Sequence, residues 1–269
     1  MRVSSLKGIV KAAGSVALVL ALPYRSLAQD ADQLAKQVQN PVASLISMPL
    51  QANWDFGIGD REATGTLLNI QPVAPFGLTK DWNVILRVIM PLQSQPTDTS
   101  ARITGMGDTT MTLFFSPAKT GKVIWGAGPA LLIPTATSDA LGTEKFGVGP
   151  SVVALVQPGK WTTGALWNQI WSVDGAIDRP DINQMYLQPF ANYNLPDGLA
   201  VGSQMEISTN WDADSEKTTA FLYFSISKVT LLGRRPVSFL AAAGPAVVHP
   251  DGRADWRLRF AATFLFPRK

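Results

Sequence analysis

The stretch that decides the fold is residues 255–266, which read DWRLRFAATFLF. From Trp256 to Phe266 every second residue is apolar, and most of these are aromatic. The residues between them begin with Arg257 and Arg259. Because side chains alternate between the two faces of a strand, this pattern predicts a strand with one apolar face and one face that carries two arginines.

The same period recurs along the chain, with turn residues between the segments and almost no helical periodicity. The predicted strands are residues 45–56, 64–74, 82–90, 107–116, 122–133, 146–157, 161–171, 183–194, 199–208, 217–227, 236–247 and 255–266. The connections alternate between short turns and longer, more polar loops, which is typical of outer-membrane barrels. We therefore predict an all-β fold: a closed, antiparallel, up-and-down transmembrane β-barrel of about 12 strands. The alternative is a soluble periplasmic β-sandwich.

The N-terminal 28 residues have the pattern of a secretory signal peptide. Arg2, Lys7 and Lys11 precede an apolar stretch over 12–22, and small residues at 26 and 28 form a cleavage site. The stretch is too short to span a bilayer, although an N-terminal anchor helix is the alternative. We divide the chain into a signal peptide (1–28), an N-terminal tail or short helix (29–44) and an outer-membrane barrel (45–269).

Composition agrees with export to a membrane. Residues 1–28 carry four basic residues and no acid, so removing them changes the net charge from +3 to about −1, and the chain has no cysteine. The basic balance is therefore no evidence for nucleic-acid binding, and no disulfide framework is expected. Charged residues make up 16% of the chain, below the roughly 25% of soluble domains.

Two features leave alternatives open. Residues 30–41 have helical spacing of apolar residues, which fits a disordered tail, a helix at the periplasmic mouth or a lumen plug.

Four prolines fall inside predicted strands, three of them after glycine. Because proline cannot donate to a strand ladder, we expect β-bulges at the glycine–proline pairs. These prolines are Pro129, Pro150, Pro189 and Pro245.

Several segments resemble a known family. They include NPVASLISMPLQ (40–51), NIQPV (69–73), WGAGP (125–129), EKFGVGP (144–150) and PDG (250–252) followed by DWRLRF (255–260). Together they are similar to the outer-membrane barrel "transporter" proteins grouped with the MetA component of phenol-degradation pathways. The resemblance implies a Gram-negative outer-membrane location and a porin-like transport role, and it supplies no catalytic residues. One departure is that Pro267 and two basic residues follow Phe266, where many such barrels end on an aromatic residue.

We find no catalytic, cofactor or metal motif, and the sequence predicts no enzyme. Gly126-x-Gly128 lacks the third glycine and the helix of a nucleotide loop. His249 is the single histidine, so a membrane-embedded hydrolase would have to use it as its base. The acidic loop residues match no calcium loop. They are Asp174, Asp178, Asp181, Asp212, Asp214 and Glu216.

Polar residues on the face opposite the apolar one are the candidates for a selective lumen lining. They are Asn83, Arg87, Gln204, Glu206, Arg257 and Arg259. A buried salt-bridge network that plugs a narrow barrel is the equal alternative. The predicted function is passive passage of small organic solutes, including hydrophobic or aromatic ones; a non-conducting structural or binding barrel is the alternative. The partners we expect are outer-membrane lipids, lipopolysaccharide and the barrel-assembly machinery, with no indication of oligomeric state.

Overall fold

The computed structural model describes residues 31–97, 99 and 101–267, so the predicted signal peptide lies outside the described residues. The described chain forms one helix, residues 31–38, followed by strands. The strands are β1 (Ile46–Ile58), β2 (Ala63–Ile70), β3 (Val73–Gly77), β4 (Trp82–Pro96), β5 (Arg102–Met106), β6 (Thr109–Pro117), β7 (Val123–Ile133), β8 (Lys145–Val156), β9 (Trp161–Gly175), β10 (Asn183–Asn194), β11 (Leu199–Asn210), β12 (Thr218–Leu232), β13 (Arg235–Val248) and β14 (Trp256–Phe266).

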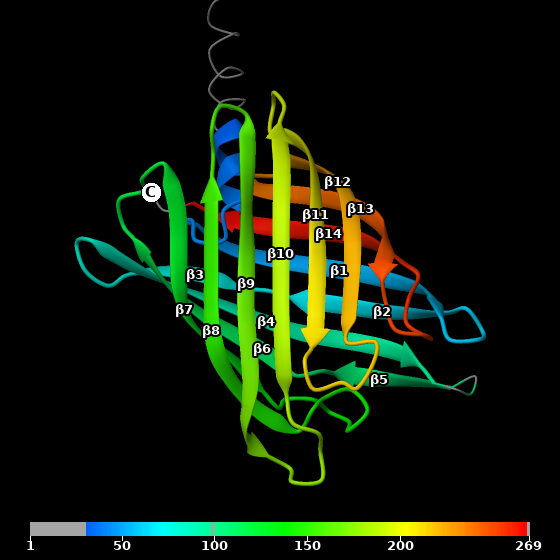
Figure 1. The fold of residues 1–269 in the computed structure, drawn as a ribbon. Coiled ribbons are helices and arrows are strands. Elements are labelled where there is room, and N and C mark those ends of the chain that lie inside the picture. The colour runs from blue at the N-terminus through cyan, green and yellow to red at the C-terminus, as the bar shows by residue number, and fades with distance from the viewer. Residues whose placement is uncertain (1–30, 98, 100, 268–269) are drawn as a thin grey trace, which may run out of the picture.

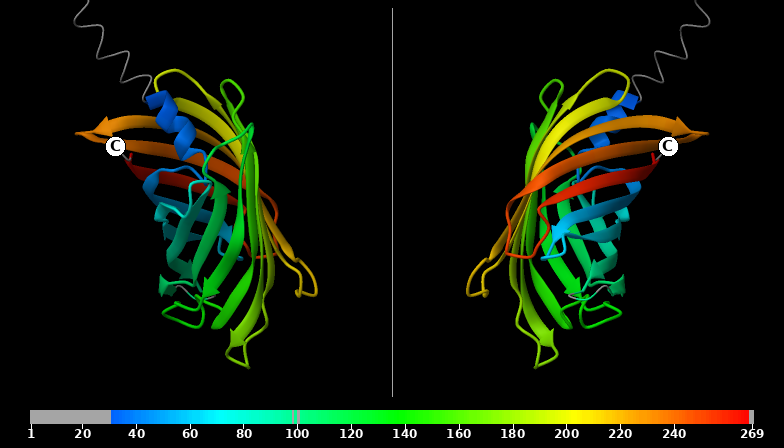
Figure 2. Two further views of the ribbon diagram at one scale, coloured as in Figure 1. Left: turned by 90° about the vertical axis from the view of Figure 1, so that its left-hand side faces the viewer. Right: turned by 90° about the vertical axis from the view of Figure 1, so that its right-hand side faces the viewer.

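These segments form one closed antiparallel barrel with 12 positions around its wall (Figures 1 and 2). β2 and β3 lie end to end along β4, and β5 and β6 lie end to end along its other edge. Each pair therefore fills one position. β14 pairs with β1 from Phe266 opposite Ile46 to Trp256 opposite Phe56, which closes the ring. The predicted fold class is confirmed.

One long loop predicted at 91–106 is mostly strand. β4 continues to Pro96, where it pairs with Arg102 of β5, so the connection is reduced to residues 97–101. Pro91 and Pro96 conceal this extension in the sequence, because proline argues against a strand interior. In the structure Pro91 lies opposite Asn69, and the strand alternation continues through it.

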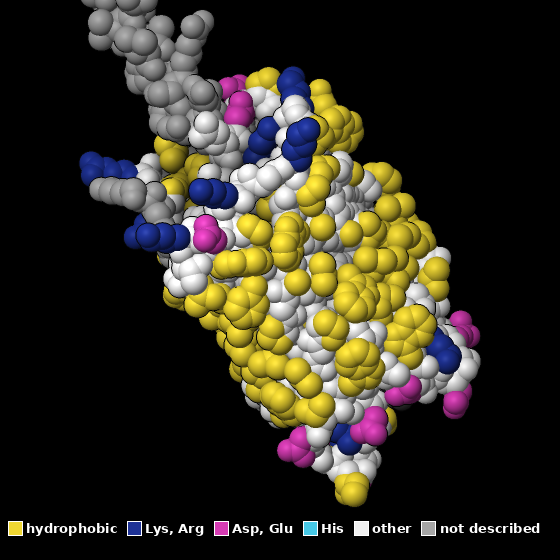
Figure 3. All heavy atoms as spheres, turned by 60° about the vertical axis from the view of Figure 1, so that its left-hand side comes forward, with side chains coloured by type: hydrophobic (Ala, Val, Ile, Leu, Met, Phe, Trp, Pro, Cys, Tyr) yellow, Lys and Arg dark blue, Asp and Glu magenta, His cyan; other side chains and the backbone are white. Residues whose placement is uncertain are grey.

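The outer wall is apolar. On the outward face of the last strand Trp256, Phe260 and Phe266 are exposed, and Phe224 of β12 is 64% exposed. Figure 3 shows hydrophobic side chains spread over one side of the barrel, with charged side chains gathered toward its two ends. A closed barrel leaves no unpaired strand edge, and an apolar belt between polar ends suits a bilayer. Among the described residues, no helix is long and apolar enough to cross a membrane.

Aromatic side chains mark both rims of this belt. At the end with the short turns, Trp82 meets Trp125 edge to face, with ring centroids 5.9 Å apart. At the other end, Phe56 stacks on Trp256 at 4.2 Å. Tryptophan and tyrosine are enriched where a protein crosses the membrane–water interface. The tryptophans at the two rims therefore fit interfacial girdles.

The bulges predicted at the glycine–proline pairs are wrong. The strand register is the same on both sides of Pro129, Pro150 and Pro189, and it is unchanged from Ala243 to Ala246 across Pro245. The barrel instead brings the strands close together at these pairs. A Cβ atom on Gly149 would lie 1.7 Å from the carbonyl oxygen of Gln169 in the neighbouring strand. Glycine is therefore required for this close approach. The nearest register shifts lie a few residues away, between Phe146 and Gly147 of β8 and between Ala246 and Val248 of β13.

The close approach at Gly149 leads to a prediction. We expect Gly149→Ala to lower the free energy of unfolding by about 1–3 kcal/mol, because the added methyl group must displace backbone of β9. The matched control is Gly77→Ala, since a Cβ there would meet nothing within 4 Å. Urea unfolding of both variants in lipid vesicles measures the difference, and equal midpoints would contradict the prediction.

Candidate functional site

The interior of the barrel holds three successive cavities. A cavity of about 920 Å³ lies toward the long loops, a central one of about 290 Å³ follows, and one of about 260 Å³ lies beside the N-terminal segment. Arg257 and Gln184 line both the first and the second cavity. Arg87 and Arg259 line both the second and the third. The basic side chains thus stand at the junctions between the chambers.

A network of ion pairs holds two of these arginines. Arg259 donates to both carboxylate oxygens of Glu206, over 2.7 and 2.9 Å. Arg257 donates to both carboxylate oxygens of Asp55, and its Nη1 lies 3.8 Å from Glu206 Oε2. Tyr223 also donates to Glu206, over 3.3 Å. Bidentate arginine–carboxylate contacts are among the stronger polar interactions, so this network fixes the arginines against the wall.

The strand order explains how these groups meet. Asn53 and Asp55 of β1 lie opposite Arg259 and Arg257 of β14 across the closing seam. Glu206 is on β11, so the arginines must reach over β12 and β13. The inward positions of β13 beside them are Ala242 and Gly244, and these small residues leave room for the guanidinium groups. The aromatic rings of β12 complete the contact, since the Arg259 guanidinium lies 4.5 Å from the centre of the Tyr223 ring.

The other candidate residues are placed less tightly. Arg87 of β4 lines the central cavity and donates to Gln71 Oε1 over 3.0 Å. Gln204 donates to Glu206 over 3.0 Å and lines the third cavity. Asn83 shares the inward face of β4 with Arg87, but it lines none of the three cavities. Five of the six candidate residues from the sequence therefore line the cavities inside the barrel.

Sequence reasoning missed the partners Asn53 and Asp55. The signal was present, because Gln51, Asn53 and Asp55 alternate with apolar residues in β1. It also missed Tyr223 as a donor to Glu206 and Gln71 as the acceptor for Arg87. Gln71 lies at the break between β2 and β3, where strand periodicity does not apply.

The N-terminal segment narrows the lumen at the end with the short turns (Figure 1). Its helix is bound to two of those turns: Lys36 donates to the carbonyl oxygen of Gly159 over 2.6 Å, and Gly198 N donates to Asp32 over 2.6 Å. The helix residue Ala35 is buried against Val229 and other wall residues.

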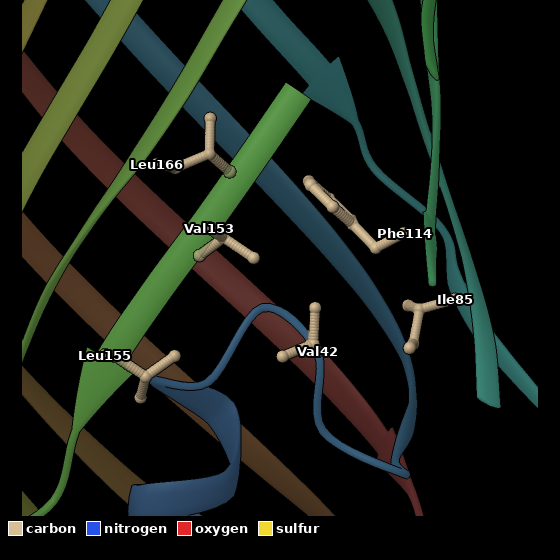
Figure 4. Packing of buried hydrophobic residues seen from close by; sticks show 6 residues of the cluster. All are labelled: Val42, Ile85, Phe114, Val153, Leu155 and Leu166. Atoms are coloured by element: carbon tan, nitrogen blue, oxygen red, sulfur yellow. The ribbon is translucent and has the colours of Figure 1, made fainter. Parts of the chain in front are cut away.

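The residues after the helix continue inside the barrel. Figure 4 shows Val42 pointing toward Phe114, Ile85 and Val153 of the wall, with which it forms a buried apolar cluster. Segment 35–43 also lines the third cavity together with the barrel wall. The segment therefore occupies lumen space that the wall alone would leave open.

The opposite mouth is narrowed by loop 134–144. Asp108, in the break between β5 and β6, accepts hydrogen bonds from the backbone N–H and hydroxyl of Thr143, over 2.6 and 2.7 Å, and from Ala136 N. Leu141 is buried, and its carbonyl oxygen accepts a hydrogen bond from Gln93.

Beside this loop, the hydrogen bond from the Lys145 ammonium, together with one from the Ser172 hydroxyl, holds the pKa of Asp181 below its ordinary value.

We predict that Asp108→Ala releases this loop. The variant loses three hydrogen bonds to one carboxylate, so the Thr143 and Ala136 amides should exchange with solvent faster, by at least about tenfold if each charged hydrogen bond contributes about 1.5 kcal/mol or more. Hydrogen exchange with mass spectrometry measures this. Asp139→Ala, an exposed carboxylate in the same loop, is the control. Equal exchange in the two variants would contradict the anchoring role.

Among the described residues, His249 has an acid beside it but no serine. Its Nε2 lies 3.7 Å from Asp255, and its Nδ1 lies 3.0 Å from the carbonyl oxygen of Pro250. Within the part of the chain that the structure describes, no serine hydroxyl bonds to it, and no cluster of three His, Cys, Asp or Glu residues could hold a metal. Four of the six acidic loop residues accept hydrogen bonds from the protein: Asp174, Asp181, Asp212 and Glu216.

Comparison with known proteins shows the fold. No family model and no curated protein sequence matches this chain. A crystal structure of an outer membrane channel from Pseudomonas putida F1 superimposes with a TM-score of 0.65, at 14% identity, over 83% of this chain and 96% of that chain. The NanC porin superimposes with a TM-score of 0.51, at 12% identity, over 82% of this chain and all of its own. The chain is thus similar in fold to two solved membrane barrels.

Proposed function

We propose that this chain is a bacterial outer-membrane channel for the passive passage of small organic solutes, including hydrophobic or aromatic ones. The observation that carries the proposal is the series of three cavities inside a closed barrel with an apolar outer belt. The fold similarity to a solved outer membrane channel supports it, as does the resemblance of the sequence to MetA-grouped barrels. Export by a signal peptide, lipid and lipopolysaccharide contacts, and insertion by the barrel-assembly machinery are parts of this proposal.

A non-conducting barrel is the second candidate, and two observations favour it. The ion-paired Arg257, Arg259 and Glu206 side chains line the central cavity, and the N-terminal segment narrows one mouth. A narrow lumen filled by side chains can serve structure or surface binding without transport.

Single-channel recording of the refolded chain in a planar bilayer separates the two. Reproducible conductance steps from membrane-inserted, heat-modifiable protein are the expected result. Arg257→Ala should then change ion selectivity, because charged side chains at a constriction set it. Inserted protein without conductance would overturn the channel proposal and favour the non-conducting barrel.

A further inference from the structure

The central cavity contains more positive than negative side-chain charge. Its junctions hold three arginines and, through the network, two carboxylates: Arg87, Arg257, Arg259, Asp55 and Glu206. The two carboxylates are both within ion-pair distance of Arg257 or Arg259. In the described part of the chain, Arg87 forms no ion pair, and its one hydrogen bond is to the neutral amide of Gln71. The surplus of one positive charge is therefore located at Arg87.

The guanidinium of Arg87 is available to the cavity. Only its Nη2 donates to a residue of the described chain, and it has no fully buried polar atom lacking a partner. Its remaining N–H groups therefore face accessible space. A guanidinium presents parallel donors that match the two oxygens of a carboxylate, so a carboxylate is the group that these donors fit.

The other residues that line the cavity limit the size, polarity and charge of a ligand that can bind there. Apolar side chains line one part of it, among them Ile89, Leu132 and Ile170. A cavity of about 290 Å³ lies near the lower limit of small-molecule sites, which begin at roughly 300 Å³. The surplus of one positive charge at Arg87 matches one negative charge on a ligand, and with Glu206 in the same cavity a second negative charge would have no cation to oppose it.

We propose that the central cavity is a binding site for small organic monocarboxylates with a compact apolar body, with Arg87 holding the carboxylate. This assignment deepens the proposed channel function and rests on it, because a solute must enter the lumen to reach the cavity. The site then acts as a selectivity point at which an organic acid replaces water around Arg87.

The probe is benzoate, compared with the neutral, similarly sized benzyl alcohol. Isothermal titration of refolded protein in zwitterionic detergent at neutral pH should show benzoate binding at least about tenfold tighter than benzyl alcohol, since a hydrogen bond to a charged group contributes about 1.5–3 kcal/mol. Arg87→Met, which keeps an unbranched apolar stem but removes the charge and the N–H donors, should abolish this preference. The control Arg253→Met, in the exposed loop before β14, should retain it.

Equal affinity for the two probes in the unmodified protein would overturn the site, whether or not Arg87→Met folds. An unchanged preference in folded Arg87→Met would overturn it as well. Recording benzoate block of the ion current separates this proposal from the channel function. Conductance without benzoate preference rejects the site alone, whereas benzoate preference in a non-conducting protein supports the site and rejects the channel.

Discussion

Glu206→Gln should lower the free energy of unfolding by about 3 kcal/mol, because removing one partner of a buried ion pair leaves the opposing charge uncompensated. Glu206 is the acceptor for both Nη atoms of Arg259 and lies near Arg257. The Glu206 and Arg259 side chains are only 15% and 5% exposed. Without the carboxylate charge, Asp55 is the one acid left in the network.

Urea unfolding in lipid vesicles, followed by tryptophan fluorescence, measures the loss. The matched control is Glu62→Gln, the same substitution at an exposed position in the turn 59–62, where we expect little change. The conductance of the variant should also shift toward anions, since the lumen gains one net positive charge. A Glu206→Gln midpoint equal to that of Glu62→Gln would refute the structural importance of the network.

Deletion of residues 31–43 should raise single-channel conductance several-fold. The deletion removes the helix and Val42, which occupy the lumen between the short turns and the third cavity. The barrel strands begin at Ile46, so their pairing is retained. The apolar wall residues that the segment covers, such as Leu265, become accessible to water, and we expect a modest loss of stability as well.

Planar bilayer recordings of the deletion and of Gln33→Ala test this. Gln33 is an exposed helix residue, so its substitution should leave the conductance unchanged. If the deletion variant inserts and conducts like the full chain, the segment does not limit passage, and the constriction must lie at the arginine network instead.

The fold could be predicted from the sequence because strand alternation is a local property. Trp256 to Phe266 alone distinguishes an outward from an inward face, and the inward position of Arg257 and Arg259 follows once this strand closes against the first. Asn53 and Asp55 show the same alternation, but the contact of Glu206 with these arginines could not be predicted in the same way. Which side chains meet across a lumen depends on the stagger of the strands around the barrel, and that is set by all the pairings together.

Segments where alternation fails were also where prediction failed. Pro91 and Pro96 conceal the end of β4, and the glycine–proline pairs, where the sequence predicts bulges, mark close strand contacts. The position of the N-terminal helix depends on hydrogen bonds to turns more than 100 residues away, such as that from Lys36 to Gly159. Helical spacing alone could not distinguish a tail from a segment inside the barrel.

The closing seam has a consequence for how the chain assembles. Asp55 and Arg257 are 202 positions apart, and Asn53 and Arg259 are 206 apart, so these contacts form between the first and last strands. Contacts of such long sequence separation slow folding, and we expect ring closure to be the late step of insertion. Until then both edges carry charged side chains, which discourage pairing with other chains. The seam therefore favours its own partner strand over misassembly.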